Sequence, residues 1–399
     1  MYLKRDLEKV IKEHAKFPVV VIQGPRQSGK TTLATTFFKK HTYLSFEDPE
    51  IRAFAQTDPK RFLRNYENSH GLILDEFQYV PQILSYIQLD VDQRKKSGYF
   101  ILTGSQNFLV NEAVIQSLAG RVGILMLLPF SLHELKSNDL LPQRLDDAIF
   151  NGCYPRLHEK KISAQVFYRS YVHTYLQRDV RQLINVGDLR TFQKFMALCA
   201  GRVGQQLNID DLAVSTGIAR DTVNRWLSLL EASYILFFLR PYFNNFNKRL
   251  TKTPKLYFYD TGLACALLGI KKSSDIALSP FRGPLFESYV VADLCKQFQN
   301  LGEEPPLYFW RDQNGRLEVD CLIDTGIKLV SVEIKSGETI SGDFFDQLSR
   351  WQELSGAQSK DSFVVYGGNA KQVRSTGSII GWQQCGILAA STQKTMKTR

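Results

Sequence analysis

One short stretch combines glycine, lysine and threonine in the spacing that phosphate binding requires. Residues 24–31 read Gly-Pro-Arg-Gln-Ser-Gly-Lys-Thr and match the pattern G-x-x-x-x-G-K-[ST] in full. Glycines let backbone N–H groups fold around phosphates, Lys30 reaches the β and γ oxygens, and the Thr31 hydroxyl binds Mg²⁺. A helix is predicted over 32–38, and its amino end adds a dipole that favours an anion. We therefore expect ATP to be held by Gly24, Pro25, Arg26, Gln27, Ser28, Gly29, Lys30, Thr31 and Thr32.

A pair of acids follows an apolar run further along the chain. Residues 71–76 read Gly-Leu-Ile-Leu-Asp-Glu, which predicts a strand that ends in two carboxylates at the edge of a sheet. Asp75 would hold Mg²⁺ through water, and Glu76 would polarise the attacking water. The alternative is a strand that simply ends in a charged turn.

Three further residues are candidates for the site of hydrolysis. Residues 99–102 predict the next strand, and Ser105 and Asn107 after it are candidates to bind the γ-phosphate or the water, although a plain turn fits either one. Arg121 follows a helix predicted over 113–118, and we expect it where that helix leaves the nucleotide edge of the sheet. There it would stabilise charge on the nucleotide of a neighbouring subunit. An ordinary surface ion pair is the alternative.

The elements that must position these residues are short runs that are apolar on both faces. Runs at 19–22, 42–46, 72–74, 99–102 and 124–128 alternate with helical stretches, which predicts a five-stranded parallel α/β sheet. The order of phosphate loop, acidic strand, polar residue and arginine resembles AAA+ ATPases over about residues 1–200. Residues 117–122 (Ser-Leu-Ala-Gly-Arg-Val) and 128–131 (Leu-Pro-Phe-Ser) resemble a prokaryotic AAA+ family with a C-terminal domain of unknown function. That resemblance implies a similar architecture along nearly the whole chain.

A helix-turn-helix pattern occupies residues 209–227, with Gly217 at the turn. Its second helix would expose Arg220, Asn224 and Arg225, which suit contacts with phosphates and base edges. A basic hairpin at 247–255 with Lys248, Arg249 and Lys252 fits a wing that contacts the DNA backbone. A winged helix with a purely structural or protein-binding role is the alternative, because Asp210, Asp211 and Asp221 dilute the local charge.

Acidic residues near the C-terminus have the order of a nuclease-like site. Glu287 lies on a predicted helix, Asp320 on a strand at 319–323, and Glu333 and Lys335 on the next strand at 329–334 and just beyond it. Glu333 and Lys335 share a face because side chains alternate along a strand. The set resembles the PD-(D/E)-x-K nucleases, which implies one or two Mg²⁺ or Mn²⁺ ions on Asp320 and Glu333, completed by Glu287. Many members of that superfamily keep the fold without cleaving, and a solvated strand edge is the alternative.

Composition, charge and cysteine spacing narrow the classes of protein to which the chain could belong. The chain has 399 residues with 50 Lys+Arg and 40 Asp+Glu, and the net charge of +10 points weakly towards nucleic acid or acidic lipid. No apolar run approaches the roughly 20 residues that span a bilayer, and no secretory signal is visible, so we expect no membrane role. The six cysteines lie far apart, which favours reduced thiols in a cytoplasmic protein.

The predicted fold class is α/β with a P-loop AAA+ parallel sheet, a helical lid, a winged helix-turn-helix and a restriction-endonuclease-like α/β domain. Expected boundaries are 1–140 for nucleotide binding, 141–204 for the lid, 205–262 for the winged helix, 263–390 for the nuclease-like domain and 391–399 for a disordered tail.

The leading hypothesis is an ATPase that acts on DNA as a homo-oligomer, in a closed ring such as a hexamer or in a partial ring, because Arg121 could reach a nucleotide only in another subunit. One alternative is a slow ATP-dependent switch whose C-terminal domains bind proteins. Another is a working motor with an inactive DNA-binding platform.

Overall fold

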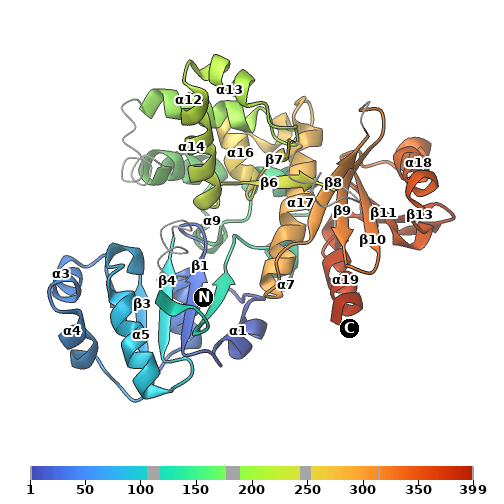
Figure 1. Ribbon diagram of the computed structural model, residues 1–399. Coiled ribbons are helices and arrows are strands. Elements are labelled where there is room, and N and C mark those ends of the chain that lie inside the picture. Colours follow the sequence, from blue (N-terminus) through green and yellow to red (C-terminus); the bar gives the residue numbers. More distant parts are fainter. Residues whose placement is uncertain (1, 106–116, 177–188, 243–252, 313–314, 398–399) are drawn as a thin grey trace. The chain divides into compact units, whose positions relative to one another are not determined.

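The computed structural model describes residues 2–105, 117–176, 189–242, 253–312 and 315–397, and it divides into two compact units (Figure 1). The first unit contains residues 1–130 with the short segments 232–234 and 299–303. The second contains residues 131–231, 235–298 and 304–399. Each unit is described by itself.

The first unit is built on a five-stranded parallel sheet with the order β2-β3-β4-β1-β5, which confirms the predicted strands. The strands are β1 (Val19–Gln23), β2 (Thr42–Ser45), β3 (Leu72–Asp75), β4 (Phe100–Gly104) and β5 (Val122–Met126). The helices are α1 (Glu8–His14), α2 (Lys30–Phe37), α3 (Pro49–Thr57), α4 (Pro59–Asn65), the short η1 (Phe77–Tyr79) and α5 (Ile83–Arg94).

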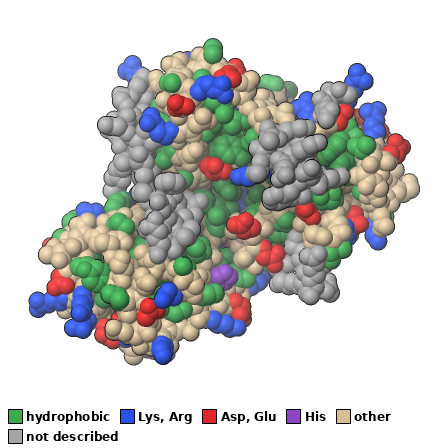
Figure 2. Space-filling view, in the orientation of Figure 1, with side chains coloured by type: hydrophobic (Ala, Val, Ile, Leu, Met, Phe, Trp, Pro, Cys, Tyr) green, Lys and Arg blue, Asp and Glu red, His purple; other side chains and the backbone are tan. Residues whose placement is uncertain are grey.

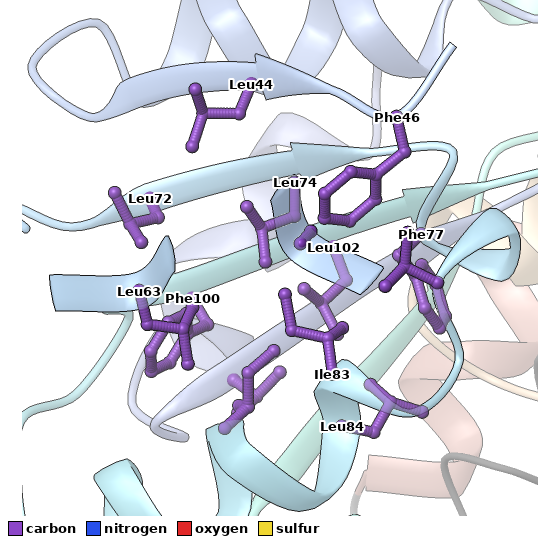
Figure 3. Close-up of a cluster of buried hydrophobic side chains, with 14 of the residues drawn as sticks. Leu44, Phe46, Leu63, Leu72, Leu74, Phe77, Ile83, Leu84, Phe100 and Leu102 are labelled. Atoms are coloured by element: carbon purple, nitrogen blue, oxygen red, sulfur yellow. The ribbon is translucent and has the colours of Figure 1, made fainter. Parts of the chain in front are cut away.

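Both faces of this sheet are covered, which is why its strands read as continuous apolar runs. Alternate residues such as Leu72, Leu74 and Leu102 point into one cluster with side chains from α3, α4 and α5 (Figure 3). The intervening residues, such as Ile73 and Ile101, pack with side chains from α1 and α2 on the other face. The sheet edges where the strands end are therefore the positions left for polar chemistry.

The second unit holds an eight-stranded mixed sheet with the order β12-β13-β11-β10-β9-β8-β6-β7. The strands are β6 (Leu236–Pro241), β7 (Lys255–Phe258), β8 (Leu307–Arg311), β9 (Glu318–Asp324), β10 (Leu329–Lys335), β11 (Ser362–Tyr366), β12 (Gln372–Arg374) and β13 (Gly377–Gly381). Strand β6 pairs with β8, so strands from 205–262 and from 263–390 share one sheet. The predicted boundaries at 140, 204 and 262 remain predictions.

Helices make up the rest of the second unit. They are α7 (Leu132–Ser137), α8 (Leu145–Asn151), α9 (Pro155–Lys160), α10 (Ala164–Ser170), η2 (Tyr171–Leu176), α12 (Leu189–Ala200), α13 (Ile209–Thr216), α14 (Arg220–Ala232), α16 (Thr261–Leu267), η3 (Ser273–Asp275), α17 (Arg282–Asn300), η4 (Gly342–Phe345), α18 (Asp346–Ser355), η5 (Ser359–Asp361), η6 (Trp382–Gln384) and α19 (Ile387–Lys397). No helix within the described ranges combines the length and hydropathy needed to cross a bilayer.

The predicted disordered tail at 391–399 overlaps helix α19. Helix α19 continues to Lys397. Its first turns bury Leu388, Ala389 and Thr392, and the Thr392 hydroxyl donates a hydrogen bond to the Leu388 carbonyl at 2.9 Å. Position 392 is therefore packed, and disorder of the tail as a whole remains a prediction.

Candidate functional site: a phosphate loop beside an acidic strand end

The order of the sheet brings the predicted hydrolytic residues to one edge. Strand β4 lies between β1 and β3, and all three run parallel, so their carboxyl ends meet. The phosphate loop follows β1, Asp75 and Glu76 end β3, and Ser105 follows β4. Such an edge is the usual ligand-binding position in open α/β sheets.

The backbone of the loop requires its glycines. Gly24 has φ of 149°, and a Cβ there would lie 2.0 Å from the Leu127 carbonyl oxygen. Gly29 has φ of 93° and forms the left-handed N-cap of α2, which begins at Lys30. Gln27 also has a positive φ, of 62°. The loop therefore turns tightly from β1 into α2 and leaves the amino end of that helix facing the phosphate position.

Two buried side chains of the loop fit a phosphate ligand. The Lys30 amine reaches back over the loop to the Pro25 carbonyl oxygen at 2.8 Å and is 5% exposed. The Ser28 hydroxyl is fully buried and has no hydrogen-bond partner within the described part of the chain. Pro25 and Gln27 lie in the same turn, and Thr32 follows in α2. Arg26 at the loop's outer side contacts Glu47 and the Tyr79 hydroxyl, each at 3.3 Å.

The residues predicted to hold Mg²⁺ are in contact. The Thr31 hydroxyl lies 3.0 and 3.1 Å from the two carboxylate oxygens of Asp75. Asp75 also accepts hydrogen bonds from the hydroxyls of Tyr43, at 2.9 Å, and Thr103. Burial raises the pKa of Asp75 above its ordinary value, with Glu76 adding to the shift, while these hydroxyl donors oppose it.

This donor set fits a P-loop magnesium site. Such a site takes one hydroxyl, a carboxylate acting through water, and oxygens of the phosphates. No group of three or more His, Cys, Asp or Glu side chains in the described ranges is arranged to bind a metal, and a P-loop site needs none. Thr31 and Asp75 are the residues that would hold the ion.

Glu76 has an unusual backbone and a defined side-chain position. It lies in the left-handed region at φ 53° and ψ 46°, which re-aims its side chain at the end of β3. Its Oε2 atom accepts hydrogen bonds from the buried Ser105 hydroxyl at 2.9 Å and from the Gln78 amide. Ser105 thus contacts the carboxylate directly, and Gln78 is a contact that sequence reasoning missed. Asn107 lies outside the described residues.

Arg121 does not lie at the nucleotide edge, and that expectation is wrong. It immediately precedes β5, and its carbonyl pairs with the N–H of Val19 at the start of β1. Because β1 has five residues, Arg121 is about 16 Å of strand away from its own phosphate loop. Its guanidinium binds Asp92 through two hydrogen bonds of 2.6 and 3.0 Å and is 34% exposed. Action on a neighbouring subunit remains a prediction.

A buried arginine behind the phosphate loop was also missed. Arg5 donates hydrogen bonds to the carbonyl oxygens of Ser28, at 2.7 Å, and Leu128, at 2.6 Å. Its guanidinium carbon lies 4.8 Å from the centre of the Phe130 ring, and the residue is 4% exposed. The side chain therefore supports the loop from behind. Arg5 stands in a densely charged N-terminal stretch, and neither its type nor its spacing marks it out there.

Only some of the residues predicted for the nuclease-like site contact one another. Lys335 and Glu333 share a face of β10 as predicted, with the ammonium 2.7 Å from Oε1. Asp320 on β9 accepts a hydrogen bond from the Ile334 N–H at 2.8 Å. Burial raises the pKa of both Asp320 and Glu333, and Asp320 is raised further by Glu333 and Glu287. These acids interact electrostatically without forming a ready metal site within the described residues.

Glu287, the fourth residue predicted for the nuclease-like site, has hydrogen-bond partners outside that predicted site. Glu287 on α17 accepts hydrogen bonds through Oε1 from the Lys255 ammonium, at 2.9 Å, and the Tyr257 hydroxyl, at 2.5 Å. Both donors lie on β7, which the sequence did not connect with the acids. Pairing of β7 with β6, and of β6 with β8, carries these donors into the sheet that holds Asp320.

Two helices form in the segment predicted as a helix-turn-helix, and the winged helix itself remains a prediction. Helices α13 and α14 flank Gly217, which has φ of 79° and ends α13. Arg220, Asn224 and Arg225 are exposed on α14, and Arg220 pairs with Asp210 at 3.0 Å. Antiparallel β6 and β7 follow, but Lys248, Arg249 and Lys252 lie outside the described residues. In the face drawn in Figure 2, basic and acidic side chains are interspersed.

Comparisons with known proteins agree with this arrangement. Residues 16–136 match an AAA domain family, residues 142–274 a domain of unknown function (DUF8612), and residues 282–385 another domain of unknown function (DUF4143). The uncharacterized protein Rv2008c of Mycobacterium tuberculosis is 30% identical over 329 residues, which cover 81% of this chain and 71% of the relative. The chain belongs to the Rv2008c family. The AAA domain makes its first unit an ATP-binding P-loop ATPase domain.

The chain is also similar to other proteins at lower sequence identity. The uncharacterized protein MJ1637 of Methanocaldococcus jannaschii is 23% identical over 420 residues, which cover 92% of this chain and 85% of the relative. The Walker-type ATPase PABY2304 of Pyrococcus abyssi superposes with a TM-score of 0.45 and 16% identity, covering 67% of this chain and 96% of that one. The RuvB Holliday junction branch migration motor of Thermotoga maritima gives 0.29 and 17%, with 58% and 85% covered. Scores this low carry no functional conclusion.

Proposed function

We propose that this member of the Rv2008c family hydrolyses ATP and couples the hydrolysis to binding or remodelling DNA. The observation that carries the hydrolytic part is the cluster of Thr31, Asp75, Glu76 and Ser105 at one sheet edge, next to the phosphate loop. Mg²⁺, when bound at Thr31 and Asp75, would neutralise charge on the β and γ phosphates.

The residues of the chain have distinct tasks in this reaction. Lys30 exchanges its contact with the Pro25 carbonyl for phosphate oxygens, which keeps the buried ammonium paired. Ser105 and Gln78 hold one oxygen of Glu76, and no described group hydrogen-bonds its Oε1, which is therefore available to accept a proton from water. Thr103 and Tyr43 fix the rotamer of Asp75.

The DNA part rests on the exposed face of α14. One side of that helix is exposed and carries Arg220, Asn224 and Arg225. Val223 and Trp226 are buried on the other side. Trp226 packs there against Phe192 and Phe195 of α12. An exposed second helix with cations and an amide suits backbone and base-edge contacts. The proposal includes a homo-oligomer, either a ring such as a hexamer or a partial ring, in which Arg121 acts on the nucleotide of a neighbouring subunit.

An ATPase assay with and without duplex, single-stranded and branched DNA, run beside a native mass measurement, tests this proposal. Stimulation by any DNA form that is lost in an Arg220→Glu/Arg225→Glu variant supports the motor. Equal rates with and without every DNA form would contradict it and favour a slow nucleotide switch that binds proteins. An Asp221→Lys variant serves as the matched control, because it changes charge on the same helix in the opposite direction.

Asp320, Glu333 and Lys335 favour a second candidate activity, metal-dependent cleavage of nucleic acid. The ammonium of Lys335 held 2.7 Å from Glu333 resembles the pairing that orients water in such sites. Cleavage that disappears in Glu333→Ala and Lys335→Ala, but persists in Lys30→Ala, would establish a nuclease independent of ATP. Cleavage unaffected by the first two changes would assign the activity to a contaminant.

A further inference from the structure

Lys255 is a buried cation beside Glu287, Glu318 and Asp320, three carboxylates that are called the acidic set below. It begins β7 and is 4% exposed. Its ammonium lies 2.9 Å from Oε1 of Glu287 and forms a second ion pair with Oε1 of Glu318. The ring of Phe309 lies on another side, with its centre 5.5 Å from the ammonium. A charged group this far from water persists only because opposite charges surround it.

The position of Lys255 is secured by the backbone on both sides. Strand β7 pairs with β6 from Lys255 to Phe258, and the Lys255 backbone forms a bridge with Gln206. Tyr257, two residues on, points to the same face and donates its hydroxyl to the same Glu287 oxygen at 2.5 Å. The lysine is therefore a built part of the acidic set and does not lie there as a mobile surface side chain.

These contacts conflict with a metal ion on Glu287. A divalent cation in a nuclease-like site needs carboxylate oxygens that face one another without an intervening cation. Here Oε1 of Glu287 already accepts two hydrogen bonds, and Glu318 is shared between Lys255 and Arg311, the latter at 3.5 Å. A metal ion placed on these oxygens would stand beside a buried ammonium and be repelled by it.

We propose that Lys255 is the resident cation of this acidic set, so that the protein binds no divalent metal ion through Glu287. The lysine supplies the positive charge that a metal would bring, and it ties β7 to α17 and β9. Glu287 is then a structural ion-pair partner and not the third metal ligand that the sequence pattern implies. This inference concerns metal binding alone and does not depend on whether the protein cleaves DNA.

Titration with Mn²⁺ in the absence of nucleotide tests the proposal, with the signal of free Mn²⁺ followed by electron paramagnetic resonance. The Lys255→Met variant keeps the length of the side chain and removes its charge. It should gain one Mn²⁺ site per chain with a Kd at least tenfold below any wild-type value. The gain should disappear in Lys255→Met/Glu287→Gln. Lys328→Met is the matched control, because Lys328 pairs with Asp361 elsewhere in the same unit.

Glu287→Gln in the wild-type background decides the question even where Lys255→Met does not fold. The proposal expects its Mn²⁺ affinity to stay within twofold of wild type. A tenfold loss would identify Glu287 as a metal ligand and overturn the proposal. So would a folded Lys255→Met variant that gains no Mn²⁺ site. Circular dichroism establishes folding in each case, and because no DNA is present, a failed nuclease assay is a separate result.

Discussion

Replacement of Arg5 by alanine should destabilise the ATP-binding unit without touching any residue predicted to contact ATP. The guanidinium joins two carbonyls, Ser28 in the phosphate loop and Leu128 after β5, that are 100 residues apart in the chain. Both hydrogen bonds are buried and charge-assisted, and the Phe130 ring covers the guanidinium. The alanine variant leaves both carbonyls without this donor.

The size of the effect follows from these contacts. An unpartnered buried carbonyl costs about 1–3 kcal/mol, and a lost cation–π contact costs about 0.5–2 kcal/mol. Water that enters the vacated space recovers part of this, so we expect a loss of about 3 kcal/mol in the free energy of unfolding. With a urea dependence of about 2 kcal/mol per molar, the midpoint should fall by about 1.5 M.

Two spectroscopic signals separate the units in this experiment. All four tryptophans, at 226, 310, 351 and 382, belong to the second unit, whereas both units contribute to far-ultraviolet circular dichroism. Arg5→Ala should shift an early circular-dichroism transition and leave the tryptophan fluorescence transition in place. Arg5→Lys should recover less than half of the loss, because one ammonium lacks the fork that reaches two carbonyls. Unchanged midpoints in both signals, with wild-type ATP hydrolysis, would refute the support assigned to Arg5.

Three further predictions address the catalytic edge and the exposed helix. Lys30→Ala should abolish ATP binding in equilibrium dialysis. Glu76→Gln should still bind ATP but hydrolyse it at least about 100-fold more slowly. Hydrolysis by Glu76→Gln at the wild-type rate would exclude Glu76 as the general base. Burial raises the pKa of Asp75, so the stability it contributes is present below its ordinary pKa and is lost as pH rises through the folded value. In urea unfolding, Asp75→Asn should therefore be more stable than wild type at pH 7, and this difference in stability should shrink towards pH 4. The variant should also lose ATP hydrolysis. Lower stability of Asp75→Asn than of wild type at pH 7 would contradict this reasoning. Arg220→Glu/Arg225→Glu should flatten the dependence of DNA affinity on salt by about two units of slope, and an unchanged slope would exclude α14 from phosphate contact.

Short sequence patterns predicted the first unit well, because its buried strands and its phosphate loop are each defined by a few neighbouring residues. A strand buried on both faces reads as a continuous apolar run, and the phosphate loop needs its glycines at fixed offsets within eight residues. Contact between Thr31 and Asp75 followed once β1 and β3 were placed as parallel strands with one carboxyl edge. The same reasoning put Glu333 and Lys335 on one face, since the period of a strand requires it.

The errors concern long-range packing, which no local spacing encodes. Arg121 was expected at the nucleotide edge because it follows a helix, but a residue just before a parallel strand lies at the opposite edge from a residue just after one. The partner of Glu287 depends on β6 joining β8, which places β7 beside acids more than 60 residues later in the chain. The role of Arg5 becomes apparent only in the folded chain, where the phosphate loop and the residues after β5 lie side by side and supply its two carbonyl acceptors.

The first unit bears an energetic cost at the two carboxylates proposed to take part in its chemistry. Burial disfavours the ionised form of Asp75, and Glu76 holds a left-handed backbone that costs a non-glycine residue on the order of 1–2 kcal/mol. Three hydroxyls around Asp75 and two donors on Glu76 offset part of that cost and fix both carboxylates before any nucleotide arrives. The Asp75 carboxylate contacts Thr31 of the phosphate loop, and both carboxylates are held buried instead of turning towards water. A hydrolytic role for this edge, as proposed above, needs such buried and fixed carboxylates, whereas a charged turn that merely ends a strand does not.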